Sequence, residues 1–133
     1  MNTAIELHDS RVIGITPSDS SVIVRFRPAY VHRSDGRPGF DPGSGWVQDC
    51  DLVVSEAVLE SNFPVMPWVL DDGWLSFDDE VFENLMPLPL DVRGAVQFSA
   101  RGLNGERQDI LGTRATVSAV GEARYVELFP GTK

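Results

Sequence analysis

The stretch RGAVQFSARGLNGERQDILGTRATVSA, residues 93–119, decides the fold class of this chain. In its first half, apolar residues recur at every second position, as in a half-buried strand: Val96, Phe98 and Ala100. The dipeptide Asn104-Gly105 follows, and these residue types suit the positive φ angles of a tight hairpin turn. In its second half the alternation returns, with three apolar residues predicted on one face: Leu111, Ala115 and Val117. The stretch therefore predicts two antiparallel strands.

The same alternation, interrupted by turn residues, recurs along the rest of the chain. Val12–Thr16 and Ser21–Arg27 flank the cluster PSDS at residues 17–20 and predict a second hairpin. Further strands are expected in four segments: Ile5–Asp9, Val47–Leu59, Trp74–Phe77 after a turn at Asp71–Gly73, and Arg124–Phe129. About seven or eight strands predict an all-β single domain over residues 1–133, either an antiparallel β-sandwich or a flattened β-barrel.

Two segments depart from this pattern. Pro28–Trp46 holds three prolines and four glycines, and its lack of periodicity predicts a long loop. We expect Ala29–Trp46 to fold back over one end of the sheet and to help form whatever site exists. Asp78–Met86 is the only helix-like segment, and it is equally compatible with an irregular acidic loop, so at most one short helix is expected.

Composition limits the classes of partner that the chain can bind and indicates its cellular compartment. Acidic residues outnumber basic ones, 20 to 11, which gives a net charge of −9. That charge disfavours nucleic acids and anionic membranes as partners. No apolar run approaches the ~20 residues of a membrane span, and the first nine residues do not resemble a signal peptide. A cytoplasmic protein is the simplest interpretation.

The two histidines of the chain are candidate ligands of a metal ion. His8 and His32, with Asp9 or Asp35, contain the residue types of a two-histidine, one-carboxylate site. Only tertiary contact could bring them together, and histidines at strand edges commonly bond to backbone or solvent. The sequence therefore favours no metal and no cofactor, while the metal site stays open as an alternative.

Charged residues two apart on one strand share a face. Asp49 and Asp51 have this spacing, and so do Arg25 and Arg27, which predicts ion pairs between neighbouring strands. Acid–base chemistry at the two carboxylates is the less favoured alternative. Cys50 is the single cysteine, so the chain forms no internal disulfide, and it is expected to be an inert buried thiol.

Large aromatic side chains are the main candidates for a ligand site or an interface. The five that stand out are Trp46, Phe63, Trp68, Trp74 and Phe77. Packing in the core alone is the slightly favoured explanation for them, and an interface or a pocket is the alternative. We expect self-association as a homodimer, with contacts drawn mainly from Phe63–Phe77, and the alternative is a monomer in which this segment covers its own sheet.

Three short stretches carry a resemblance: ELHDS at Glu6–Ser10, ENLMPLPL at Glu83–Leu90 and GEARYVE at Gly121–Glu127. With these, the chain resembles a family of small uncharacterised bacterial proteins, a domain of unknown function, over most of its length. The resemblance implies a bacterial cytosolic all-β domain. It carries over no catalytic residue.

The leading hypothesis for function is a non-enzymatic binding or interaction module of the bacterial cytoplasm, with a small molecule or a protein as partner. It rests on the absence of any nucleophile–base, metal or cofactor signature beside abundant aromatic residues. The alternative is a small hydrolase or isomerase with a histidine–carboxylate site at one end of the sheet. Its candidate residues are His8, His32, Asp49 and Glu127.

Overall fold

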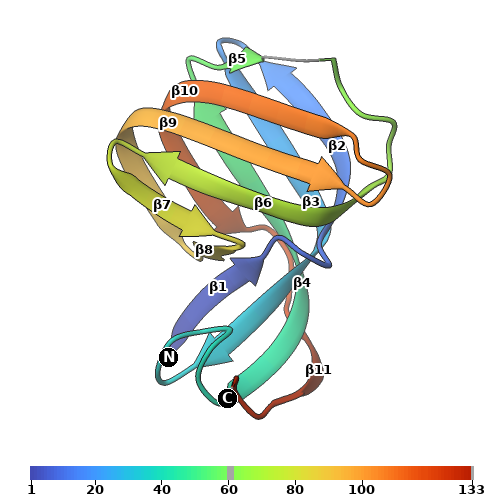
Figure 1. Ribbon diagram of the computed structural model, residues 1–133, viewed down its shortest axis with the longest axis vertical. Helices are drawn as coiled ribbons and strands as arrows, with labels where there is room; N and C mark the ends of the chain where they lie inside the picture. The colour runs from blue at the N-terminus through green and yellow to red at the C-terminus, as the bar shows by residue number, and fades with distance from the viewer. Residues whose placement is uncertain (60–61, 133) are drawn as a thin grey trace.

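Six antiparallel strands close into a barrel in the computed structural model, which describes residues 1–59 and 62–132 (Figure 1). The barrel strands are β2 (Arg11–Ser18), β3 (Ser21–Ser34), β4 (Gly43–Ser55), β6 (Trp68–Phe77), β9 (Leu90–Gly102) and β10 (Arg107–Ala119). Their order is β4-β10-β9-β6-β2-β3, and pairing of β3 with β4 completes the circle. The predicted all-β fold is confirmed, with the barrel as its form, and no helix occurs among the described residues.

Strands β3 and β4 continue beyond the barrel and form the middle of a second sheet. There β1 (Asn2–Glu6) pairs with the second half of β3, and β11 (Arg124–Phe129) pairs with the first half of β4. Strand β8 (Leu85–Pro87) adds to the free side of β1. This extension sheet, ordered β8-β1-β3-β4-β11, lies at the end of the molecule that carries both termini (Figure 1). Two short strands, β5 (Val58–Leu59) and β7 (Glu80–Glu83), pair with β10 and β6.

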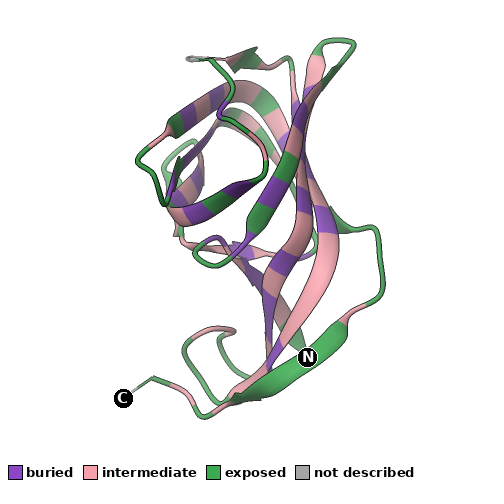
Figure 2. Cartoon of the chain, turned by 90° about the vertical axis from the view of Figure 1, so that its right-hand side faces the viewer, coloured by how far each residue is buried: buried purple, intermediate pink, exposed green. Residues whose placement is uncertain are grey.

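The barrel interior is the hydrophobic core. Alternate residues of the six strands point inward, among them Phe26, Leu52, Leu75, Phe98 and Ile110, all with no exposed surface. The expected burial of Cys50 is confirmed, and Leu52 and Val54, on the same face of β4, are fully buried with it. Figure 2 shows the contrast with β11, which is exposed along nearly its whole length. None of the described residues belongs to a helix long and apolar enough to cross a membrane.

The long loop predicted for Ala29–Trp46 is wrong in its extent. Only residues 35–42 connect β3 to β4, and we call them the tip loop. The flanking glycines are strand residues placed where a side chain would not fit: a Cβ on Gly43 would collide with the carbonyl of Arg33. These glycines allow close strand approach rather than flexibility. The tip loop itself does fold back onto β1, as expected of the longer segment.

The limit of at most one short helix holds, but two segments take a different form from the one that the sequence indicated. The helix-like segment Asp78–Met86 instead forms a turn, β7 and part of β8. Asp78 and Asn84 have φ angles of 50° and 61°, outside the helical range. The expected turn at Asp71–Gly73 lies inside β6, where the pairing with β9 shifts register between Leu70 and Asp72. That irregularity absorbs the turn-forming residues without ending the strand.

Candidate functional site

A groove of about 480 Å³ lies between the edge of the extension sheet and the tip loop. Its volume is typical of sites for small ligands. Strands β1 and β8, with the residues that follow β8, form one wall, and the tip loop forms the other. The lining is mainly apolar and includes Ala4, Pro38, Phe40, Leu85, Pro87 and Leu88.

Hydrogen bonds hold the tip loop in place as a wall of this groove. The Asn2 side-chain amide donates to the carbonyl of Gly36 at 2.7 Å. Within the loop, the backbone N–H of Arg37 donates to Asp41 Oδ2 at 2.6 Å. Gly39 adopts a φ of 85° and lies so close to Leu85 that a Cβ would stand 2.8 Å from its methyl groups. The groove is therefore present before any ligand binds.

One charged side chain lies among the residues that line the groove. The Arg37 guanidinium stands 4.2 Å from the centre of the Phe40 ring, an arrangement that suits a cation–π contact. Arg37 is exposed and its charge is available to solvent at the rim. In a chain with a net charge of −9, it places one positive charge at this edge of the groove.

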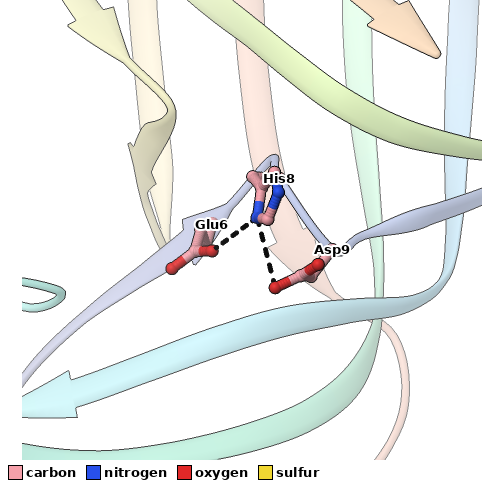
Figure 3. Close-up of side chains that lie close together, drawn as sticks. All are labelled: Glu6, His8 and Asp9. Carbon is pink, nitrogen blue, oxygen red and sulfur yellow. Dashed lines mark hydrogen bonds and ion pairs between the residues drawn. The ribbon is translucent and has the colours of Figure 1, made fainter. Parts of the chain in front are cut away.

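A separate polar cluster lies where β1 turns into β2, and Figure 3 shows its three side chains. His8 Nδ1 is 3.4 Å from Glu6 Oε2 and 3.2 Å from Asp9 Oδ2. One ligand atom from each residue lies within 4.8 Å of the other two. His8 and Asp9 are exposed, while Glu6 is partly buried. The cluster thus presents one nitrogen and two carboxylates toward solvent.

His32 of β3 connects this cluster to the interior. Its Nε2 lies 2.7 Å from Glu6 Oε1, and the residue is only 3% exposed. Tyr30 and Phe129 contact its ring edge to face, with centroids 5.1 and 4.9 Å away. Burial raises the pKa of Glu6, but the hydrogen bonds and charges of His32 and then His8 outweigh it and hold that pKa below its usual value. Glu6 is therefore an anchored carboxylate.

The polar contacts continue across the extension sheet. Tyr30 donates its hydroxyl proton to Glu127 Oε1 at 2.7 Å, although β4 lies between their strands. The residue between them is Gly45, whose missing side chain leaves room for the Tyr30 hydroxyl. Burial, the bond to Glu127 and its charge all raise the pKa of Tyr30. The tyrosine is a neutral donor at ordinary pH.

The structure brings together only some of the polar residues predicted from sequence. His8 and His32 both contact Glu6, and Glu127 joins them through Tyr30. Asp49 of β4 and Asp35 of the tip loop are not among the residues grouped around His8. None of these side chains lines the groove.

The predicted ion pairs between β3 and β4 form at one carboxylate only. Arg27 and Arg25 place Nη1 atoms 2.9 and 3.8 Å from Asp51, which confirms the pairing for that residue and not for Asp49. Cys50 points into the core, and burial, followed by the charge of Asp49, raises its pKa to about 12. Asp51 thus joins β3 to β4, and Cys50 packs in the core.

The five aromatic candidates do not converge. Trp68 is buried in the barrel, Trp74 and Phe77 are half-buried on β6, and Phe63 is exposed. Trp46 packs against the core from the extension sheet, under the guanidinium of Arg33. None of them lines the groove.

Sequence reasoning missed Glu6, Tyr30 and the groove. The spacing Glu6-x-His8-Asp9 was a usable signal for the cluster, because three potential ligands fall within four positions. The sequence contained no comparable signal for the groove, because its walls come from segments that lie 30 or more positions apart. Comparison of the chain with known protein families, with curated proteins and with solved structures gave no match.

Proposed function

We propose that this protein is a non-enzymatic binding module whose groove takes an elongated apolar ligand with one anionic group. The observation that carries the proposal is an apolar groove of about 480 Å³ with a single charged side chain, Arg37, among its lining residues. A preformed apolar pocket with few polar groups is the usual form of a small-molecule site. We place the module in the bacterial cytoplasm, as the resemblance of its sequence implies.

The apolar lining supplies affinity. Each methylene group that a ligand buries contributes ~0.8 kcal/mol, so a short alkyl chain gains several kcal/mol before the costs of binding. The hydrogen bonds that Asn2 donates and Asp41 accepts already order the tip loop, which reduces the loss of conformational freedom on binding. Both features favour a ligand with an apolar body.

Arg37 supplies the preference for an anion. Its five donors suit carboxylate or phosphate oxygens, and its stacking on Phe40 fixes the plane of the guanidinium. The net charge of −9 repels anions at long range, but salt screens that repulsion beyond about 8 Å at physiological ionic strength. The local cation therefore decides which head group is accepted.

A hydrolase or isomerase at the histidines is the alternative. It requires that at least two of His8, His32, Asp49 and Glu127 converge in a deep polar cavity. His8 and His32 do meet at Glu6, but His8 is exposed and His32 is enclosed by aromatic rings. The groove next to them is lined by neither, which favours binding over catalysis.

Calorimetric titration with octanoate, octanol and octylamine tests the proposal, because these probes share a chain and differ in charge. We expect octanoate to bind more tightly than the other two. Arg37→Gln should abolish the preference for octanoate over octanol, and Phe40→Ser should weaken all three probes. Arg93→Gln, an exposed arginine on β9 outside the groove, is the matched control and should change nothing.

Two outcomes would overturn the proposal. The first is that none of the three probes binds the wild-type protein. The second is that octylamine binds at least as tightly as octanoate, which would exclude Arg37 as the head-group site.

A further inference from the structure

We propose that Glu6, His8 and Asp9 form a binding site for a divalent transition-metal ion of the zinc class. The site is independent of the groove, since none of its three residues lines that hollow. Each residue offers one donor atom, and the three donors lie on one turn (Figure 3).

The spacing of the donor atoms fits a single ion. Zinc binds histidine nitrogen and carboxylate oxygen at about 2.0–2.2 Å, so neighbouring ligands of one ion lie roughly 3–3.5 Å apart. His8 Nδ1 is 3.4 Å from Glu6 Oε2 and 3.2 Å from Asp9 Oδ2. The two carboxylate oxygens lie within 4.8 Å of each other, so binding requires side-chain adjustments that draw the three donors around the ion.

Hydrogen bonds to two neighbouring segments hold the backbone that carries these donors. The N–H groups of Leu7 and His8 donate to the carbonyl and side chain of Asn84, at 2.7 and 2.8 Å. The Ser10 hydroxyl, which is buried, donates to the carbonyl of Glu6 at 2.6 Å and accepts from the N–H of Tyr30. The turn is thus tied both to β3 and to the segment before β8.

The backbone of Asp9 is likewise held in one conformation before an ion binds. Its φ of 75° lies in the left-handed region, which non-glycine residues seldom adopt unless their surroundings hold them there. Its N–H donates to the carbonyl of Leu70 at 3.3 Å. This conformation turns the Asp9 carboxylate back toward His8.

His32 acts on the site through Glu6 and is a positioning residue. Its Nε2 bonds to Glu6 Oε1, which leaves Oε2 directed at His8. Buried hydrogen-bond partners of this kind orient the carboxylate ligands of metal sites. The second ring nitrogen of His32 is buried without a hydrogen-bond partner, so the bond to Glu6 is the hydrogen bond that orients both groups.

The donor set selects the metal. One imidazole nitrogen with two carboxylates suits zinc, cobalt, nickel or manganese, whereas magnesium and calcium prefer oxygen ligands alone. A dication would also balance the two negative charges that face His8 from either side. Because the cluster is exposed, water can complete the coordination.

Zinc titration of protein first treated with chelator tests the site. We expect one equivalent of Zn²⁺ to bind and to raise the melting temperature, because an ion that binds the folded chain stabilises it. Nuclear magnetic resonance should show the shift of one histidine ring, assigned to His8 by its loss in His8→Gln. His8→Gln and Asp9→Asn should each weaken Zn²⁺ binding at least tenfold.

Controls separate this site from ordinary surface ion pairs. Both substituted residues are exposed, so the variants should keep the wild-type circular dichroism spectrum. Asp35→Asn, an exposed acid in the tip loop, should bind Zn²⁺ like the wild type. The proposal is overturned if the wild type binds no Zn²⁺, if Ca²⁺ or Mg²⁺ binds more tightly than Zn²⁺, or if His8→Gln and Asp9→Asn leave the affinity unchanged.

Discussion

The Tyr30 hydroxyl bonds to Glu127 at 2.7 Å directly over Gly45, the residue of β4 that separates their strands. We predict that Gly45→Ala destabilises the fold by about 1–3 kcal/mol, because a Cβ there would overlap the hydroxyl oxygen. Removing that oxygen with Tyr30→Phe should recover part of the loss in the double variant. Urea denaturation measures both effects, and a Gly45→Ala protein as stable as the wild type would contradict the packing described.

Cys50 makes the stability of the barrel sensitive to alkaline pH. Its pKa rises from an ordinary 9.0 to about 12 in the fold, chiefly through burial. A raised folded-state pKa stabilises the protein fully below pH 9, and that contribution is lost as the pH rises from about 9 toward 12. Urea unfolding between pH 8 and pH 10.5 should show this decline, and Cys50→Ala should show a shallower one. Equal slopes in the two proteins would exclude Cys50 as the cause.

The barrel interior should dominate the mutational sensitivity of the chain. Phe98 on β9 is completely buried, so Phe98→Ala should cost about 3–5 kcal/mol through lost contacts and a residual cavity. Leu128 on β11 is 77% exposed, and Leu128→Ala should change stability by no more than about 0.5 kcal/mol. Thermal or urea denaturation compares the two, and a similar cost at both positions would contradict the assignment of the core.

Self-association remains a prediction, and the structure sharpens its test. Light scattering at micromolar concentration should give about twice the monomer mass of 14.6 kDa. Trp68 is a core residue, so its truncation would damage the fold rather than report on an interface. Phe63 and Val65 are exposed, and the double variant Phe63→Ser, Val65→Ser should dissociate the dimer. A monomeric wild type would refute the dimer, and a dimer that survives this variant would refute the interface.

Alternation of apolar residues predicted most of the barrel, because each strand has one face in the core. It failed where the backbone changes register. Leu111 shares its predicted face with Ala115, yet Ile110 is buried and Leu111 only partly so. The change coincides with a β-bulge or similar irregularity, where the register between β9 and β10 shifts between Gly112 and Arg114. Composition cannot reveal such a bulge.

The same limit applies to the site. His8 and Asp9 were recognisable as potential ligands because they are adjacent in sequence. The pairing of Glu6 with His32, 26 positions later, depends on the register between β1 and β3, which no local pattern encodes. The glycines of Pro28–Trp46 led to the wrong prediction of a long loop for a related reason. The sequence does not distinguish a glycine that permits close strand packing from a glycine that permits a turn.

Barrel closure gives six strands two neighbours each, whereas the extension sheet ends in β8 on one side and β11 on the other. The main-chain groups along the outer side of β11 are therefore a template onto which a foreign strand can add. Three apolar side chains there are more than 40% exposed: Tyr125, Val126 and Leu128. Their burial would stabilise the addition of a strand to this edge. What opposes it is the irregular pairing between Tyr125 and Glu127, together with the charges of Arg124 and Glu127. The outer side of β11 is thus a place where two chains can pair through their edges, far from the core that determines the stability of each.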